Sequence, residues 1–173
     1  MLAPCLLVTA AAFSNAAPNI FIYDDNNWLP IARPAGESLL ASLTSMFRDD
    51  PWAATRSLTQ PYRPLTWASF LVDQRFWDGW RTGFHLTSIA LHGLASVLVF
   101  LLLRAVLTAT RAPASPARAW LPALLAAAVF ALHPIHTEAV DSVFNRSEIL
   151  ATVCVLGSLL ALARLEARRP AAA

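Results

Sequence analysis

Two adjacent acidic residues, Asp24 and Asp25, follow directly on an apolar amino-terminal segment. Neighbouring carboxylates repel one another, and this repulsion raises the pKa of one of them. Such a carboxylate can act as a general base toward a hydroxyl group, and a pair can also bind a cation. Asp is equally common at a solvated helix end or turn. The pair is therefore either a catalytic or binding element, or simply the end of a helix.

Two arginines have neighbours that suit the recognition of a phosphate. Arg63 lies in the run Tyr62-Arg63-Pro64, and its planar guanidinium could pair with a phosphate through two parallel hydrogen bonds. Arg146 lies in a short polar run with Glu138 and Glu148, and it could hold an anionic headgroup. A surface ion pair explains Arg63 equally well, and an internal salt bridge explains Arg146 equally well.

Four histidines fall in or beside apolar segments. His133 and His136 are three positions apart with a proline between them, and Glu138 follows two positions later. The proline interrupts the helix that would bring the two rings onto one face, and a metal ion needs three or four well-placed ligands. These residues therefore predict no metal site. His85 and His92 are seven apart on one helical face, where packing with a hydrogen bond is the expected role.

The segments that carry these residues are too apolar for a soluble domain. The chain has 173 residues, of which 57% are hydrophobic and only 14% charged, whereas soluble domains carry about 25% charged residues. The net charge of +2 gives no indication of a nucleic-acid partner. Cys5 and Cys154 both fall in apolar segments and are expected to be small buried hydrophobes. The composition predicts an all-α integral membrane protein.

The apolar pattern predicts about four transmembrane helices. The expected order is a first helix over residues 1–22, an outer or luminal loop over 23–83, a second helix over 84–107, a cytoplasmic connection over 108–118, a third helix over 119–133, an outer loop over 134–148, a fourth helix over 149–165 and a cytoplasmic tail over 166–173. A short helix is expected within the long loop, over Ser38–Phe47. Residues 1–17 could instead be a cleaved signal peptide, although they lack its basic start.

The arginines set the expected orientation. Arg104, Arg111 and Arg118 lie in or next to the connection after the second span, without an acidic residue. Arginines also gather at the end of the fourth span. By the positive-inside rule the connection and the tail are cytoplasmic. The two loops that hold most of the polar residues then lie together on the outer or luminal face.

Six motifs, taken in their order along the chain, resemble one family. They are Phe21-Ile22-Tyr23-Asp24-Asp25, Phe47-Arg48-Asp49-Asp50-Pro51-Trp52, Tyr62-Arg63-Pro64-Leu65-Thr66, Gly83-Phe84-His85-Leu86 with His92, the run 130–140, and Arg146-Ser147-Glu148. Each motif is short, but the ordered set over residues 20–150 is similar to the transmembrane and tetratricopeptide-repeat O-mannosyltransferases and their bacterial relatives. That family has the multi-span type C glycosyltransferase fold.

The resemblance implies transfer of mannose from a polyprenyl (dolichyl) phosphate carrier to Ser or Thr hydroxyls of a protein. Asp24 or Asp25 would be the general base, and Arg63 and Arg146 would bind the donor phosphate. The residues expected to support them are Tyr62, His133, His136, Glu138 and Glu148. The resemblance implies no cofactor and no metal, because an arginine can stabilise the leaving phosphate instead.

The chain also departs from the family. Family members often have Asn where Ser88 stands and Gly-Arg-Ala-Glu where Asn145-Arg146-Ser147-Glu148 stands. They have roughly twice as many spans or more, followed by tetratricopeptide repeats of about 34 residues, and no such repeat occurs in this chain. We therefore expect the amino-terminal four-helix portion, with the Ala-rich third span turning a small-residue face toward further helices.

Two other functions fit the same sequence. One is a non-catalytic membrane module that binds lipid or assembles with another membrane protein, or a truncated relic of the enzyme. The other is part of a small transporter. This function is less well supported, because the spans carry few of the interior charges that mark an ion path. The expected location is the endoplasmic reticulum membrane in a eukaryote or the inner membrane in a bacterium.

Overall fold

The computed structural model describes residues 2–22, 25, 38–48, 63–110 and 116–168. The regular elements within these ranges are all helical. They are α1 (Ala3–Ala12), the 3₁₀ turn η1 (Ser14–Ala16), α3 (Leu39–Arg48), α4 (Pro64–Trp77), α5 (Arg81–Thr110), α6 (Pro116–Leu132), the 3₁₀ turn η3 (Pro134–His136), α7 (Thr137–Asp141) and α8 (Arg146–Glu166). The predicted all-α class is confirmed.

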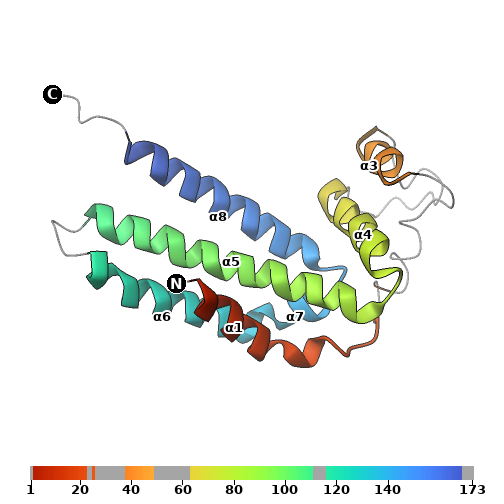
Figure 1. Ribbon diagram of the computed structural model, residues 1–173, viewed down its shortest axis with the longest axis horizontal. Helices are drawn as coiled ribbons and strands as arrows, with labels where there is room; N and C mark the ends of the chain where they lie inside the picture. Colours follow the sequence, from red (N-terminus) through yellow and green to blue (C-terminus); the bar gives the residue numbers. More distant parts are fainter. Residues whose placement is uncertain (1, 23–24, 26–37, 49–62, 111–115, 169–173) are drawn as a thin grey trace.

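Helix α5 is the centre of the structure. Figure 1 shows α8 along one side of it, α6 and α1 along the other, and α4 and α3 beyond its first turns. Its 30 residues contain no proline, so the helix continues without a break far enough to cross a bilayer. Among the described residues, α5 and α8 are long and apolar enough to span a membrane, and the bent pair of α6 with η3 and α7 raises the number to three.

The amino-terminal helix is shorter than the predicted first span. Helix α1 has ten residues, and only the single turn η1 follows it. Pro18 explains the end of the helical backbone, because proline lacks the N–H that the next turn would need. Helix α1 packs closely on α5 at Gly93, where an added Cβ would lie 3.1 Å from the Leu6 side chain.

The third predicted span bends at His133. Helix α6 ends at Leu132, and His133 itself is extended (φ −67°, ψ 127°). The helical segments on either side of it differ in direction by 46°. The cause is Pro134, because a proline disfavours the helical conformation of the residue before it. The expected interruption of the helix by this proline is confirmed.

The Ala-rich face of α6 is buried within the chain, whereas the sequence predicted that it would be exposed toward further helices. Four alanines at four-residue spacing are each at most 7% exposed and face α5 and α1. They are Ala119, Ala123, Ala127 and Ala131. The exposed residues of α6 are instead large: Leu121, Leu125, Val129 and Leu132. Small residues allow close approach of helix backbones within this chain. The small-residue face is therefore an internal interface, and the outward face is aliphatic.

The described part of the long loop predicted over residues 23–83 includes two helices. Helix α3 confirms the predicted short helix, and Ser38 Oγ accepts a hydrogen bond from the Ala41 N–H (3.2 Å) as its cap. Helix α4 begins with Pro64 and ends at a left-handed turn at Asp78 (φ 46°). Its buried side belongs to the hydrophobic core formed by Trp67, Phe70, Leu71, Phe84 and Val143. This packing fixes α4 against the first turns of α5 and α8.

Candidate functional site

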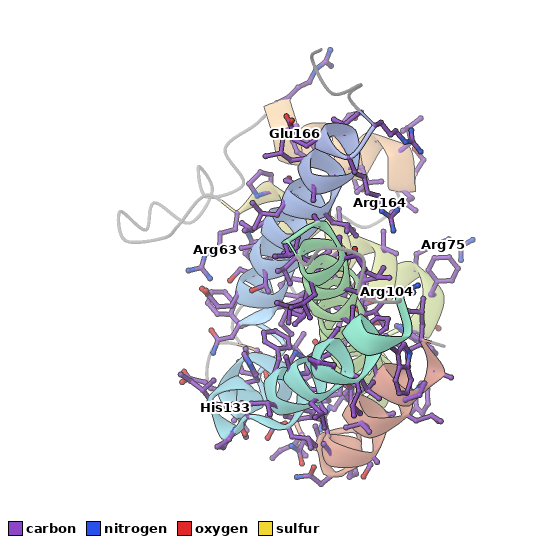
Figure 2. The ribbon with its side chains drawn as sticks, turned by 90° about the vertical axis from the view of Figure 1, so that its left-hand side faces the viewer. Arg63, Arg75, Arg104, His133, Arg164 and Glu166 are labelled. Atoms are coloured by element: carbon purple, nitrogen blue, oxygen red, sulfur yellow. The ribbon has the colours of Figure 1, made fainter. Side chains whose placement is uncertain are left out.

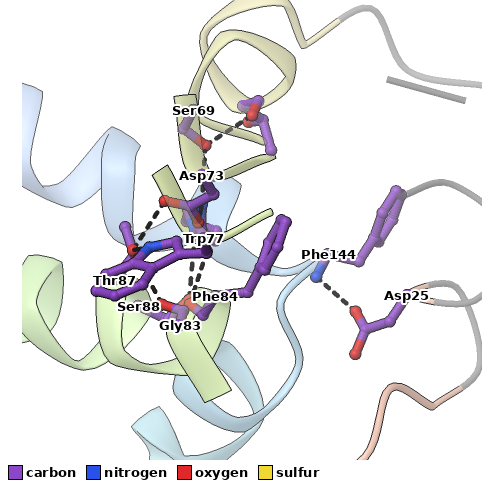
Figure 3. A network of polar contacts seen from close by, with 11 residues as sticks. Asp25, Ser69, Asp73, Trp77, Gly83, Phe84, Thr87, Ser88 and Phe144 are labelled. Atoms are coloured by element: carbon purple, nitrogen blue, oxygen red, sulfur yellow. Dashed lines mark hydrogen bonds and ion pairs between the residues drawn. The ribbon is translucent and has the colours of Figure 1, made fainter. Parts of the chain in front are cut away.

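The segment of residues 142–147, which is the connection from α7 together with the first two residues of α8, contacts both kinds of side chain that the motifs singled out. Its first half bonds to a predicted base, and its second half carries Arg146 and bonds to Arg63. Figure 3 shows Asp25 on one side of Phe144 and a network around Asp73 on the other. The site therefore lies where α5 and α8 begin.

Asp25 is fully buried and held by three donors. Its Oδ1 accepts hydrogen bonds from the Phe144 N–H (2.7 Å) and from Ser142 Oγ (3.5 Å), and its Oδ2 accepts one from the Ile22 N–H (3.4 Å). Two segments far apart in sequence thus fix one carboxylate. Its neighbour Asp24 lies outside the described residues, so only one member of the predicted pair is placed.

Arg63 lies at the start of α4 and points outward (Figure 2). Its Nη1 donates a hydrogen bond to Ser147 Oγ (2.7 Å), and its guanidinium lies 5.8 Å from the centroid of the Phe144 ring. The side chain is only half-buried. Tyr62, predicted to support it, lies outside the described residues. Arg63 is thus held at one edge while the rest of its guanidinium remains accessible.

A groove of about 430 Å³ opens beside Arg63, between the start of α4 and the outer side of α8. It is lined by Arg63, Pro64, Leu65, Thr66, Ser147, Glu148, Leu150, Ala151 and Cys154. The lining is polar next to Arg63 and apolar along α8. Such a groove suits an amphiphilic ligand with an anionic head and an aliphatic tail.

Arg146 is fully buried and does not line this groove. Its Nη1 forms an ion pair with Asp73 Oδ2 at 2.6 Å. Its nitrogens also donate hydrogen bonds to Ser69 Oγ (3.2 Å), Ser88 Oγ (3.2 Å) and the Phe84 carbonyl oxygen (2.8 Å). The internal salt bridge that the sequence left as an alternative is therefore present, and it joins α8 to α4 and α5.

Asp73, the partner of Arg146, was not singled out from the sequence. It is 3% exposed, and its Oδ1 accepts a hydrogen bond from Thr87 Oγ1 (2.8 Å). Burial raises the pKa of the Asp73 carboxyl, and the neighbouring Arg146 guanidinium opposes that rise. The spacing of Thr66, Phe70 and Asp73 places all three on one helical face. An acid on the same face as aromatic residues is the signal that could have identified it.

A second buried polar group lies beside Asp25. His85 is fully buried, and neither ring nitrogen has a hydrogen-bond partner of good geometry among the described residues. The backbone of Asn19 makes a polar contact with the ring, and Asp25 and Asp141 both act on it electrostatically. Asp141 Oδ1 is likewise buried without a partner in the described part of the chain.

The remaining predicted residues surround the bend after α6. The His136 ring lies 4.9 Å from the His92 ring, and both line a cavity of about 40 Å³ together with Glu148. His133 lies at the surface (Figure 2), and Glu138 Oε1 accepts a hydrogen bond from Asn145 Nδ2 (3.4 Å). Among the described residues, no group of three or more His, Cys, Asp or Glu could hold a metal ion.

The fold and the site define an all-helical membrane protein with a buried carboxylate and an arginine-headed groove at one end of its spans. The chain is 31% identical over 172 residues to protein O-mannosyl-transferase Tmtc1 of Drosophila melanogaster, covering 94% of the chain and 18% of that relative. It is 33% identical to Drosophila Tmtc2 over 167 residues, covering 92% of the chain and 16% of that relative. It is 31% identical to human TMTC4 over 160 residues, covering 88% of the chain and 21% of that relative.

The chain is thus homologous to the TMTC family of protein O-mannosyl-transferases over nearly its whole length, and the resemblance seen in the ordered motifs is confirmed. It spans about a fifth of the length of these curated relatives. No family model and no solved structure matches the chain.

Proposed function

We propose that this chain forms the amino-terminal membrane portion of a glycosyltransferase that moves mannose from a polyprenyl phosphate to Ser or Thr hydroxyls of a protein. One observation carries the proposal. The segment of residues 142–147 binds Asp25 through the Phe144 N–H and binds Arg63 through Ser147 Oγ. A base for the acceptor and a cation for the donor phosphate are therefore held by one short segment.

In the proposed reaction Asp25 takes the proton of the acceptor hydroxyl, and Asp24 is the alternative base. The hydroxyl oxygen forms a bond to the sugar carbon, and the bond from that carbon to the phosphate oxygen breaks. A guanidinium has five N–H donors, and Ser147 takes one from Arg63. The others would neutralise the departing lipid phosphate, which lowers the energy of the transition state.

The groove next to Arg63 supports a lipid-linked donor. Its aliphatic side, formed by Leu150 and Ala151 of α8, would hold the first units of the polyprenyl chain. In this proposal Arg146 is a positioning residue rather than a phosphate ligand, because its guanidinium is already bonded to Asp73 and its neighbours. The donor therefore needs Arg63 for its head and α8 for its tail.

We propose a topology of four membrane segments: α1, α5, the bent α6–α7 pair and α8. Asp25 and Arg63 are bonded to residues at or just before the start of α8, whereas Arg104 and Arg164 lie toward the ends of α5 and α8. The positive-inside rule then gives those ends a cytoplasmic location and gives the site an outer or luminal one. The membrane would be the endoplasmic reticulum in a eukaryote and the inner membrane in a bacterium.

The test is transfer of labelled mannose from polyprenyl phosphate mannose to an acceptor peptide, in membranes containing the protein as its source makes it. Asp25→Asn is expected to lower the rate at least about 100-fold, because general base catalysis contributes about that much. Glu166→Gln, at the far end of α8, is the matched control and should leave the rate unchanged. Normal transfer by the double variant Asp24→Asn/Asp25→Asn would exclude both carboxylates as the base.

A second candidate function, a non-catalytic lipid-binding module, is favoured by the groove alone. The groove needs Arg63 and α8 but no base. This candidate predicts binding of a polyprenyl phosphate that is weakened by Arg63→Gln and unaffected by Asp25→Asn. It also predicts that the protein without substitutions transfers no sugar.

A further inference from the structure

Glu148 carries a free carboxylate beside the arginine of the groove. It is the third residue of α8, it is exposed, and it lines the groove of about 430 Å³ together with Arg63. Among the described residues, its carboxylate takes part in no hydrogen bond or ion pair. Arg63 Nη1 donates instead to Ser147 Oγ, at 2.7 Å. Two opposite charges thus line one groove without neutralising each other.

Glu148 does not have the hydrogen bond that a glutamate at this position of a helix often makes. A glutamate three residues after the N-cap commonly accepts a hydrogen bond from the N–H of the N-cap residue. The N-cap of α8 is Asn145, and its N–H donates to the Ser142 carbonyl oxygen at 3.2 Å. The negative charge of Glu148 still interacts favourably with the helix dipole. Its carboxylate oxygens nevertheless remain available to a ligand in the groove.

The groove therefore has three chemically different parts. The Arg63 guanidinium attracts an anion, and the Glu148 carboxylate repels one. The aliphatic part is formed by Leu150, Ala151 and Cys154. An ionised carboxylate only accepts hydrogen bonds, so hydroxyl groups are the neutral groups that suit it. The lining thus fits a ligand with an anionic group, an aliphatic chain, and hydroxyl groups close to the anion.

A second cavity next to Glu148 cannot hold such hydroxyl groups. It has a volume of about 40 Å³ and is also lined by His92, Phe130 and His136. A water molecule takes up about 30 Å³ in the liquid, so this cavity has room for about one water and not for a sugar ring. The groove, whose volume lies within the range of about 300–1,000 Å³ typical of small-molecule sites, is the space in which a sugar can reach Glu148.

We propose that the Glu148 carboxylate accepts hydrogen bonds from the sugar of the donor, and so favours the sugar-bearing lipid phosphate over the bare one. This inference deepens the proposed function and rests on it for the phosphate at Arg63 and the lipid along α8. Hydrogen bonds to an ionised acceptor are stronger than neutral ones. Once the sugar has gone, the bare lipid phosphate is a monoester and carries more negative charge. Glu148 then repels it, which promotes release of the spent carrier.

The experiment measures the Kd of two probes, polyprenyl phosphate mannose and polyprenyl phosphate, by calorimetry on the complete protein from its source in detergent. Glu148→Ala should weaken binding of the mannose-bearing lipid about 10-fold, because it removes hydrogen bonds to a charged acceptor. It should tighten binding of the bare lipid about twofold to fivefold, because it removes a repulsion that solvent partly screens. A variant with damaged folding would not shift the two affinities in opposite directions.

Three further variants make the comparison specific. Arg63→Gln should weaken binding of both lipids, because both carry the phosphate. Glu166→Ala makes the same change of charge at the far end of α8 and should leave both affinities unchanged. Glu148→Gln keeps an acceptor oxygen without the charge. It should retain part of the preference for the sugar while binding the bare lipid as tightly as Glu148→Ala does.

Donors that each lack one hydroxyl group of the mannose identify the contact. At least one of them should bind the unsubstituted protein about 10-fold more weakly than the mannose donor does. The same donor should bind Glu148→Ala no more weakly than the mannose donor, because the acceptor of that hydroxyl is gone. Equal selectivity against this donor in both proteins would assign the hydroxyl to another residue and overturn the proposal.

The binding measurement separates this inference from the proposed function. Equal weakening of both lipids by Glu148→Ala, or no change in either, would overturn sugar recognition by Glu148 and leave mannose transfer standing wherever the transfer assay detects it. Opposite shifts of the two affinities in a protein that transfers no mannose would support sugar recognition by Glu148 and remove the proposed transfer function.

Discussion

The polar network around Arg146 and the group of Asp25, His85 and Asp141 differ in how completely their polar atoms are hydrogen-bonded. In the cluster around Arg146, the guanidinium contacts an acid, two hydroxyls and a carbonyl. In the group of Asp25, His85 and Asp141, the His85 ring nitrogens and Asp141 Oδ1 have no hydrogen bond of good geometry among the described residues, although the Asn19 backbone contacts the His85 ring. Fully bonded polar networks specify a structure, whereas incompletely bonded ones mark positions where another requirement competes with stability.

The largest expected difference between the clusters comes from removing one acid in each. Asp73→Asn leaves the buried Arg146 guanidinium without its counter-charge, which should cost about 3–5 kcal/mol of unfolding free energy. Asp141→Asn should change it by less than about 1 kcal/mol, because no buried positive group depends on that carboxylate alone. Unfolding of the purified protein in detergent, followed by circular dichroism, measures both. Similar losses for the two variants would contradict the proposed difference between the clusters.

A smaller difference is expected between the two buried histidines of α5. His92→Leu removes the contact with the Ala131 carbonyl and leaves that oxygen buried, at a cost of about 1–3 kcal/mol. His85→Leu removes a ring that has no hydrogen bond of good geometry and contacts only the backbone of Asn19 in this way, so it should cost less stability than His92→Leu. The same detergent unfolding experiment compares them. A His85→Leu variant as unstable as His92→Leu would show that His85 has a stabilising contact in the folded protein.

The smallest expected effect lies at the edge of the groove. Ser147→Ala removes the partner of Arg63 Nη1, and the exposure of Arg63 limits the cost to about 0.5–1 kcal/mol. The freed guanidinium should also bind the donor less precisely, so the donor KM should rise severalfold. Ser158→Ala is the control, because Ser158 Oγ donates only to the Cys154 carbonyl of its own helix. An unchanged donor KM in Ser147→Ala would show that the position of Arg63 does not affect donor binding.

The long spans could be predicted from the sequence because their apolar runs are local. The predicted ranges 84–107 and 149–165 lie inside α5 and α8, which each begin three residues earlier. The hydrophobic content that identifies a span says little about its polar first turn, where the site residues lie. The break at His133 was predictable for the same local reason, because Pro134 acts on its immediate neighbour.

The site was less predictable because its contacts join distant parts of the chain. From the sequence, Arg146 could be either a headgroup ligand or a member of a salt bridge. The choice could not be made because its partner, Asp73, lies on another helix. The two histidines of α5 were expected to behave alike, since helical spacing puts them on one face. The predicted hydrogen bond is confirmed for His92, whereas the His85 ring has only a contact with the Asn19 backbone, because the neighbouring segments differ at the two heights along the helix.

The alanine stripe of α6 has a consequence for how this protein can vary in sequence. Ala123, Ala127 and Ala131 are fully buried at the interface with α5, so a larger side chain at any of them would push the two helices apart. Leu125 and Val129, on the opposite side, have no comparable restriction apart from remaining apolar. A complete substitution library of α6 should therefore show intolerance with a period of about four residues. Homologous chains could drift widely along one side of this helix and hardly at all along the other.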